Sequence, residues 1–228
     1  MQNVENQKVV VCGGAANPAL KEIPKYVQQN KTYYIGVDAG SLQLIKAGYQ
    51  LDYAVGDFDS VTEEEFQLIK ENTSQIIKHP AQKDDTDMEL ALEIVQSKYP
   101  GIDCFIFGGI GETKGRLDHM LANIWMVYQP RFKQSVSQIK FIEKDHVFQF
   151  YFAGLHTISA DTLMPDYLSI ITLTAVKELS IENAIYNLEP TDIPYPRALI
   201  SNEFIDENHP VIISFKEGLV LVLRVNER

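Results

Sequence analysis

Short apolar runs alternate with longer amphipathic segments through the first 130 residues of the chain. The runs span residues 8–12, 32–37, 51–55, 75–78 and 103–107. The continuous run 8–12 is typical of a strand buried on both faces of a parallel sheet, and the other runs predict further strands. The segments between them predict helices that begin after Asn17-Pro18, over 42–47 with Ser41 as cap, over 62–72, and near Met88 and Arg116. Strand followed by helix, five times, predicts a Rossmann-like α/β domain with helices on both faces of its sheet.

Apolar spacing within the predicted helices indicates which side chains face the sheet. Met88, Ala91, Leu92 and Val95 form such a stripe in the fourth helix, and the fifth helix offers a second one. Its members are Leu117, Leu121, Ile124 and Tyr128. The third helix carries a start signal instead, because Thr62 and Glu65 have the spacing of a capping box.

The pattern changes near residue 130, where helical stripes end and short β runs follow one another. The runs span 139–142, 147–152, 155–158, 168–174, 179–181, 198–201, 211–215 and 219–225. Regularly spaced short strands are typical of a β-sandwich. We therefore expect an α/β domain over residues 1–130 and an all-β sandwich over 131–228, with a stiff loop at 190–196.

Acidic and glycine-rich motifs follow the predicted strands of the first domain. They are Gly13-Gly14, Asp38, the turn Gly56-Asp57-Phe58-Asp59-Ser60, the cluster Asp84-Asp85-Thr86-Asp87 reached through a loop, and the segment from Gly108 to Asp118. Ligands of open parallel sheets bind beyond the carboxyl ends of the strands, and all these motifs lie there.

Two carboxylates in Asp57-x-Asp59 would repel one another unless a cation lay between them. Mg²⁺ is held by one or two carboxylates together with substrate phosphates, so a metal–phosphate site explains the turn. The alternative is a solvated turn in which Asp59 or Ser60 caps the next helix, and Asp85 or Asp87 could cap the fourth. The convergence of motifs at one sheet edge favours the metal site.

Charge and composition exclude several classes of protein. The formal net charge is -11, which argues against an electrostatic nucleic-acid binder. No apolar run is long enough for a membrane span, and the first residues lack the apolar core of a signal peptide, so we expect a cytoplasmic protein with no membrane partner. Cys12 and Cys104 lie in apolar runs and are expected to be small buried side chains.

Four motifs in order resemble those of the thiamine pyrophosphokinase family. They are Gly56-Asp57-Phe58-Asp59-Ser60, Lys83-Asp84-Asp85-Thr86-Asp87, Gly115-Arg116-Leu117-Asp118-His119 with Leu121-Ala122-Asn123-Ile124, and Ser201-Asn202-Glu203-Phe204. The resemblance runs from about Val9 to the C-terminus. It implies a homodimer with an α/β domain and a β-sandwich, which transfers the pyrophosphoryl group of ATP to thiamine with Mg²⁺ and releases AMP.

Site residues follow from the resemblance by position. It implies that Asp57, Asp59 and Asp84 are the carboxylates associated with Mg²⁺. Substrate phosphates would be met by Arg116 and Lys83, with Asp118 and Asp87 supporting the same site. In the second domain the resemblance implies that Tyr186, Ser201 and Asn202 contact thiamine, although a buried sandwich tyrosine is the alternative for Tyr186. His119 is better explained by pairing with Asp118 than by catalysis.

Three departures from the family pattern affect these assignments. Glu112-Thr113-Lys114 is an apparent insertion before Gly115-Arg116. Ala39 and Asn183 stand where the family commonly carries glycine, and such a change matters where the backbone needs a positive φ.

Two other functions are compatible with the motifs. A metal-dependent phosphohydrolase would also use clustered aspartates, but the α/β half offers only His79 and His119 as imidazole ligands. A non-catalytic thiamine- or nucleotide-binding module would leave the acidic residues without a role.

Overall fold

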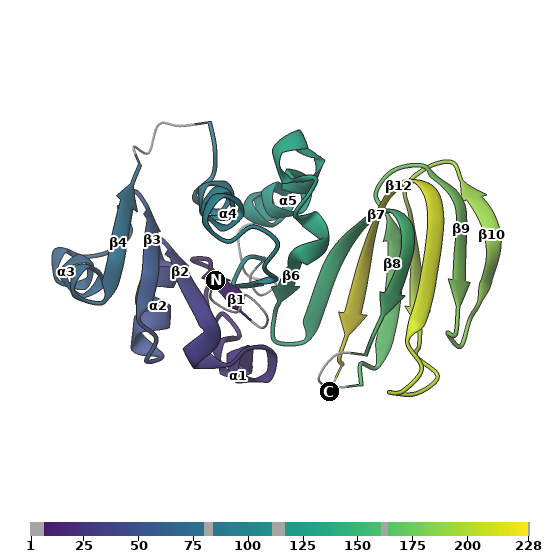
Figure 1. Cartoon of the computed structure of the whole chain (residues 1–228), viewed down its shortest axis with the longest axis horizontal. Coiled ribbons are helices and arrows are strands. Elements are labelled where there is room, and N and C mark those ends of the chain that lie inside the picture. The colour runs from purple at the N-terminus through teal and green to yellow at the C-terminus, as the bar shows by residue number, and fades with distance from the viewer. Residues whose placement is uncertain (1–6, 80–83, 111–116, 161–163, 228) are drawn as a thin grey trace, which may run out of the picture. The chain divides into compact units, whose positions relative to one another are not determined.

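The computed structural model describes residues 7–79, 84–110, 117–160 and 164–227. Its contacts divide the chain into two compact units, Met1–Lys144 and Asp145–Arg228. The predicted fold classes are confirmed, because the first unit is α/β and the second is built of strands (Figure 1). In the part of the chain that the structure describes, no helix is long and apolar enough to cross a membrane.

The first unit contains a parallel sheet with the strand order β6-β5-β1-β2-β3-β4. The strands are β1 (Lys8–Cys12), β2 (Thr32–Val37), β3 (Leu51–Gly56), β4 (Thr73–Lys78), β5 (Cys104–Phe107) and β6 (Ile139–Ile142). Val9, Val10 and Val11 of the central strand β1 are fully buried, as expected for a strand covered on both faces.

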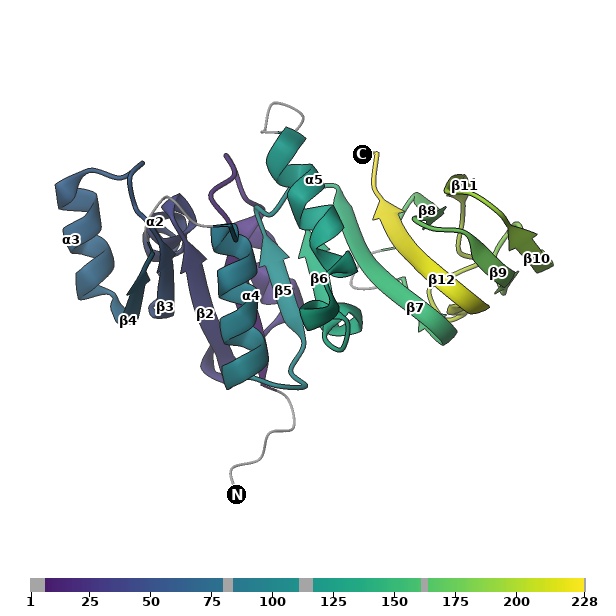
Figure 2. The ribbon, with the colours of Figure 1, turned by 90° about the horizontal axis from the view of Figure 1, so that it is seen from above.

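Helices cover both faces of this sheet, with α4 and α5 on one side and α1 and α2 on the other (Figures 1 and 2). The helices are α1 (Ile23–Tyr26), α2 (Ala39–Lys46), α3 (Glu63–Glu71), α4 (Asp87–Lys98) and α5 (Leu117–Trp125). The predicted stripe of α4 is buried, because Met88, Ala91, Leu92 and Val95 all belong to the core. The capping box of Thr62 and Glu65 on α3 is also confirmed.

Several predicted boundaries were wrong. The helix expected after Asn17-Pro18 is only a 3-10 turn (Leu20–Glu22) followed by the single turn of α1. Helix α2 begins three residues early, at Ala39, with Asp38 rather than Ser41 at its N-cap. Leu117, at the start of α5, and Tyr128, in the 3-10 turn that follows this helix, do not face inward, since 63% and 47% of their surfaces are exposed.

Residues 139–142 were expected in the sandwich, but β6 pairs in parallel with β5. Further 3-10 turns, Met126–Tyr128, Pro130–Phe132 and Val136–Gln138, connect α5 to β6. Phe132, Val136 and Phe141 are fully buried in the first unit. This tertiary burial explains why the units divide at Lys144 rather than near residue 130.

The second unit consists of antiparallel sheets that share two long strands, β7 (His146–Ile158) and β12 (Val211–Val225). The first part of β12 pairs with β9 (Val176–Glu182), which pairs with β10 (Leu188–Ile193). The second part pairs with β8 (Tyr167–Thr172), which pairs with β11 (Arg197–Asn202). One continuous core lies between them and includes Leu168, Leu179 and Val220.

Gly218 allows β12 to pass from its partner β9 to its partner β8. The register of β7 and β12 shifts between Phe215 and Leu219, and Gly218 there has a φ of 112°. A Cβ on Gly218 would lie 2.5 Å from the carbonyl oxygen of Ala175. The apolar pattern is interrupted at this bend. It therefore predicted two runs, 211–215 and 219–225, where the structure has the single strand β12.

The stiff loop predicted over 190–196, on the turn-forming character of its prolines, overlaps strand β10. Pro190 is nevertheless accommodated, since β10 pairs only with β9 among the described residues. Proline is tolerated on an edge strand, where its missing N–H costs no ladder hydrogen bond.

Candidate functional site

The acidic turn after β3 is held by its own backbone and by one buried ring. Phe58, with a φ of 58°, is buried and lies 5.1 Å from Phe66, measured between ring centroids. The N–H of Asp59 donates to Oδ1 of Asp57 at 3.0 Å. Burial of Phe58 leaves Asp57 half-buried and Asp59 exposed, so both carboxylates remain accessible to a ligand.

Asp38 supports this turn from the end of β2. Its N–H donates to the Val55 carbonyl at 2.9 Å, and its Oδ1 accepts from the Phe58 N–H at 3.4 Å. A Cβ on Gly56 would lie 1.8 Å from that Oδ1, so only glycine lets the Asp38 carboxyl approach the turn. Asp38 has a φ of 47°, which is uncommon outside glycine and is found at functional sites.

The carboxyl groups of Asp57, after β3, and of Asp87, in the first turn of α4, lie near that of Asp38. The pKa of its carboxyl is raised to about 6, chiefly by burial and next by the nearby Asp87, while the Phe58 N–H lowers it and Asp57 raises it. This accumulation of negative charge suits a hard cation, since Mg²⁺ takes carboxylate and phosphate oxygens. Within the described residues, no three Asp, Glu, His or Cys side chains are already grouped as they would be around a metal ion.

The carboxylates are not required as helix caps. Thr62 caps α3 and Thr86 caps α4, each in a capping box with the glutamate three residues later, Glu65 or Glu89. Both explanations that made Asp59, Asp85 or Asp87 a cap are therefore wrong. Asp84 is exposed just before α4, and Asp87 in its first turn reaches Asp38.

Glycines let the strand ends approach one another closely. A Cβ on Gly13 would lie 2.5 Å from the Gly108 carbonyl oxygen, and one on Gly40 would lie 2.2 Å from that of Cys12. Gly108 itself has a φ of 61°. Buried Asn123 of α5 donates through Nδ2 to the Gly109 carbonyl, which fixes the glycine-rich strand end. This gives Asn123, which belongs to the motif on α5, a structural role that its sequence position did not show.

Part of the predicted site cannot be placed. Lys83, Arg116 and the insertion Glu112-Thr113-Lys114 lie outside the described residues. Asp118 and His119 are exposed in the first turn of α5. The roles given to these residues by the resemblance stay predictions.

The second unit brings Tyr186 and Asn202 together. Oδ1 of Asn202 accepts from the Tyr186 N–H at 3.0 Å and from the Glu203 N–H at 2.9 Å, and its Nδ2 donates to the Tyr186 carbonyl at 2.8 Å. Asn202 is only 7% exposed, whereas Tyr186 is 63% exposed and is not a buried sandwich tyrosine. The geometry makes Asn202 the residue that holds the backbone of Tyr186.

The two glycine replacements fit the backbone. Asn183 has a φ of 61°, a conformation that asparagine adopts more readily than most residues, so it can stand in for glycine. Ala39 is the first residue of α2, and the positive φ falls on Asp38 instead. Ser201, next to Asn202, also has a positive φ, of 60°, and is exposed.

A cavity of about 350 Å³ lies elsewhere in the first unit. Val95, Gln96 and Tyr99 near the C-terminal end of α4 line it, together with Arg131 and Ser135. The acidic residues are at the other end of α4, so this cavity is not the site described above. Cys12 and Cys104 are both buried, as expected, and burial raises the pKa of each thiol far above its usual value.

Comparison with known proteins gives one consistent answer. Residues 24–140 match the family profile "Thiamin pyrophosphokinase, catalytic domain", and residues 155–220 match "Thiamin pyrophosphokinase, vitamin B1 binding domain". The thiamine pyrophosphokinase of Bacillus subtilis (strain 168) is 34% identical over 217 residues, which cover 94% of this chain and 96% of the relative.

Solved structures agree with the sequence matches. A thiamin pyrophosphokinase family protein from Enterococcus faecalis has a TM-score of 0.86 at 34% identity, covering 97% of this chain and all of that chain. Thiamine pyrophosphokinase from Bacillus subtilis has a TM-score of 0.80 at 31% identity, with the same coverage. The resemblance predicted from the four motifs is confirmed, and the chain belongs to the thiamine pyrophosphokinase family.

Proposed function

We propose that this chain transfers the pyrophosphoryl group of ATP to the hydroxyl of thiamine, giving thiamine pyrophosphate and AMP in a Mg²⁺-dependent reaction. The observation that carries the proposal is the meeting of Asp57 and Asp87 with the half-buried Asp38 at the carboxyl end of the sheet. That edge is where ligands of parallel α/β sheets bind. In the described part of the chain, none of these carboxylates makes a helix-cap hydrogen bond. In a member of this family, such a group is best explained by a bound metal–ATP complex.

Asp57, Asp59 and Asp84 are the residues proposed to hold Mg²⁺. When bound, the ion would neutralise charge on the phosphate oxygens and orient ATP. Arg116 and Lys83 are proposed to contact phosphate oxygens, and Asp87 and Asp118 to support the same site. Asp38 is proposed to support the metal site indirectly. Its carboxyl accepts a hydrogen bond from the Phe58 N–H and so fixes the turn that carries Asp57 and Asp59.

In the proposed step, the thiamine hydroxyl oxygen forms a bond to the β-phosphorus of ATP. The bond from that phosphorus to the oxygen shared with the α-phosphorus breaks, and its electron pair leaves with AMP. The hydroxyl proton is lost to solvent or to a carboxylate. A loose transition state gains little from a strong base, so positioning and electrostatics supply most of the catalysis and no base is assigned.

Thiamine recognition is proposed for the second unit. Tyr186 presents an exposed aromatic ring whose backbone is fixed at both its N–H and its carbonyl by Asn202. A ring on a rigid backbone can stack on the thiamine ring system at small entropic cost. Ser201 is proposed to contact thiamine directly, and Asn202 to act through Tyr186.

We further propose a cytoplasmic homodimer whose partners are the small molecules ATP and thiamine. Support for the dimer comes from the second unit, where Leu155, Ile185, Tyr195, Ile200 and Ile205 are all large apolar side chains that are about half or more exposed. A partner surface formed by these side chains is part of the proposal, because contiguous exposed apolar patches mark interaction sites.

Product analysis tests the proposed function. The protein is incubated with ATP, Mg²⁺ and thiamine, and the nucleotides are separated by chromatography, with thiamine omitted in the control. AMP and thiamine pyrophosphate in equal amounts, only when thiamine is present, support the proposal. Phosphate released without thiamine would instead support a metal-dependent phosphohydrolase, and no product would support a binding module.

A further inference from the structure

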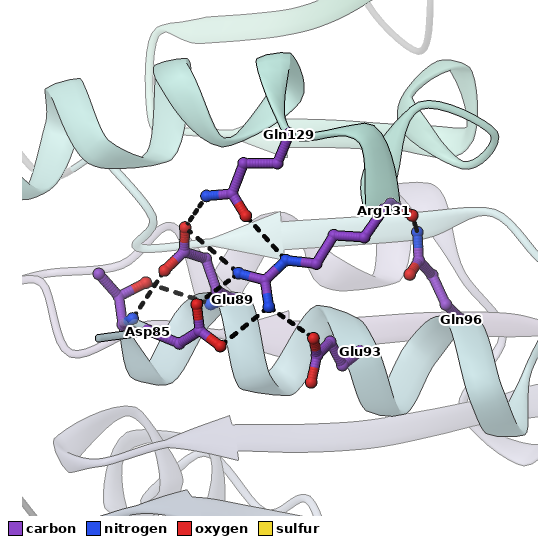
Figure 3. A network of polar contacts seen from close by, with 7 residues as sticks. Asp85, Glu89, Glu93, Gln96, Gln129 and Arg131 are labelled. Atoms are coloured by element: carbon purple, nitrogen blue, oxygen red, sulfur yellow. Dashed lines mark hydrogen bonds and ion pairs between the residues drawn. The ribbon is translucent and has the colours of Figure 1, made fainter. Parts of the chain in front are cut away.

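Arg131, in the 3-10 turn Pro130–Phe132, is the centre of a polar network on α4 (Figure 3). Its Nη2 and Nη1 donate to Oδ1 and Oδ2 of Asp85 at 2.6 and 2.8 Å, which makes a two-pronged ion pair. Nη1 also donates to Oε1 of Glu93 at 2.6 Å, and Nε donates to Oε1 of Gln129 at 2.7 Å. One guanidinium thus contacts α4 just before its first residue and again in its middle.

Glu89 joins this network to the cap of α4. Its Oε2 accepts from the Thr86 N–H at 2.7 Å, while its own N–H donates to Oγ1 of Thr86 at 3.2 Å. Its Oε1 accepts from Nε2 of Gln129 and lies 3.8 Å from Nη2 of Arg131. Glu89 is 7% exposed, and a buried carboxylate is costly unless it is paired. The cap of α4 therefore depends on Gln129 and Arg131.

The backbone that carries Arg131 is itself fixed. Nε2 of Gln96 donates to the Arg131 carbonyl at 2.9 Å and to Oγ of Ser135 at 2.6 Å. The guanidinium consequently projects from an anchored turn, and a two-pronged pair from such an anchor sets both the position and the orientation of Asp85.

Charge gives the network a second role. Residues 84–97 contain five acidic side chains and no lysine or arginine. Asp84 directly precedes Asp85, and Asp87, two residues later, reaches Asp38. Arg131 pairs with Asp85 and Glu93 and lies 3.8 Å from Glu89, so it offsets part of the negative charge that would otherwise repel Asp84 and Asp87.

We propose that Arg131 is a positioning residue that holds Asp84 and Asp87 in place for the metal–ATP complex. It does so by fixing Asp85, which lies between them in the chain, and Glu89, two residues after Asp87. The proposal rests on the proposed function for the identity of the ligand. It concerns the segment 84–89 and no group that touches the reacting atoms.

Matched substitutions on the same guanidinium test this. Asp85→Asn and Glu93→Gln each remove one carboxylate whose nearest Arg131 nitrogen lies at 2.6 Å, but only Asp85 adjoins Asp84. Arg131→Lys keeps the charge and loses the two-pronged geometry. We expect Asp85→Asn and Arg131→Lys to weaken binding of Mg²⁺ with α,β-methylene-ATP by about tenfold or more, as loss of a supporting partner of a metal ligand does. Glu93→Gln should leave that affinity within about twofold.

The affinity is measured by isothermal titration of the full chain, with the thermal midpoint recorded for every variant. If Arg131 has only a structural role, the affinity for the nucleotide should follow the thermal midpoint. Glu93→Gln and Asp85→Asn should then each change the affinity and the midpoint together. That result would overturn the proposal, as would wild-type affinity in folded Arg131→Lys. If Arg131→Lys does not fold, Asp85→Asn against Glu93→Gln decides the question alone.

Turnover separates this proposal from the proposed function. If the wild type makes no thiamine pyrophosphate, the proposed function fails, while the titrations still test whether Arg131 positions a metal–nucleotide site. If the wild type is active, kcat should fall by about tenfold or more in Asp85→Asn and Arg131→Lys. The KM for thiamine, which binds to the other unit in the proposal, should not change.

Discussion

At the scale of single residues, the structure shows that threonines rather than aspartates cap α3 and α4. The sequence allowed Asp59, Asp85 and Asp87 to be caps, but Thr62 and Thr86 occupy those positions. Carboxylates that lie close to other carboxylates repel one another, and a bound cation relieves that repulsion. This is the residue-level reason to expect a metal at Asp57 and Asp59.

Asp59→Asn is expected to lower kcat by orders of magnitude while the fold is preserved. The side chain is exposed, and the contact of Asp59 with Asp57 is made by its backbone N–H, which asparagine keeps. The measurement is initial rate against Mg²⁺ concentration, with circular dichroism as the folding control. Wild-type turnover at limiting Mg²⁺ would remove Asp59 from the metal site.

Tyr186→Ala is expected to raise the KM for thiamine about tenfold and to leave the KM for ATP nearly unchanged, since loss of aromatic stacking costs about 1 kcal/mol or somewhat more. Asn202→Ala should have the same signature and, in addition, lower the thermal midpoint. Its buried amide satisfies three backbone groups, at Tyr186 N, Tyr186 O and Glu203 N. Equal effects on both substrates in Tyr186→Ala would contradict stacking.

Asp52→Asn is expected to make stability less dependent on pH. Burial raises the pKa of Asp52, which accepts from the Tyr34 N–H at 2.8 Å. Because the pKa of Asp52 is raised in the folded state, its contribution to stability is fully present below its unfolded-state pKa. That contribution is lost as pH rises through its folded-state pKa. Asparagine still accepts that hydrogen bond but carries no charge. Its advantage over the wild type should therefore grow from pH 4 to pH 7.

The effect is small because Asp52 is only partly buried, and we expect less than about 1 kcal/mol at pH 7. Urea unfolding of both proteins at the two pH values measures it. An advantage that shrinks as pH rises would show that the Asp52 carboxylate stabilises the fold instead.

At the scale of elements, local sequence signals determined some helices and strands, and long-range contacts determined others. The buried strands and the stripe of α4 followed from hydrophobic spacing. Pro190 in β10 and the continuous strands β7 and β12 did not, because they depend on which partner lies alongside. Helix α5 is a similar case. The apolar spacing from Leu117 to Tyr128 predicted one helix, whereas α5 ends at Trp125, Tyr128 lies in a 3-10 turn, and both Leu117 and Tyr128 are exposed.

Gly218→Ala tests the bend of β12. The new Cβ would meet the Ala175 carbonyl at 2.5 Å, and φ there is 112°. Gly48→Ala is the matched control, because Gly48 has a φ of 92° and no atom within 4 Å of a new Cβ. Strain alone should cost about 1 kcal/mol in the control, and strain with the clash about 3 kcal/mol at Gly218. Urea unfolding measures both, and equal losses would mean that the strand relaxes around the methyl group.

At the scale of the whole molecule, the exposed apolar side chains of the second unit predict self-association. Light scattering coupled to gel filtration should give about twice the 25.8 kDa mass of one chain. Ile200→Glu places a charge at a side chain that is 67% exposed and should shift the population toward the single-chain mass without changing the circular dichroism spectrum. A wild-type protein of single-chain mass would contradict the dimer.

The sequence by itself determined the two fold classes, the strands and main helices of the first unit, and the family. These depend on period, on turn residues and on the spacing of short motifs, all of which are local. Tertiary structure decided the rest. Residues far apart in the chain set the pKa of Asp38, joined Arg131 to Asp85 and Asn202 to Tyr186, and placed β6 beside β5. Such pairings are fixed by packing across the fold, which no pattern along one segment of the chain contains.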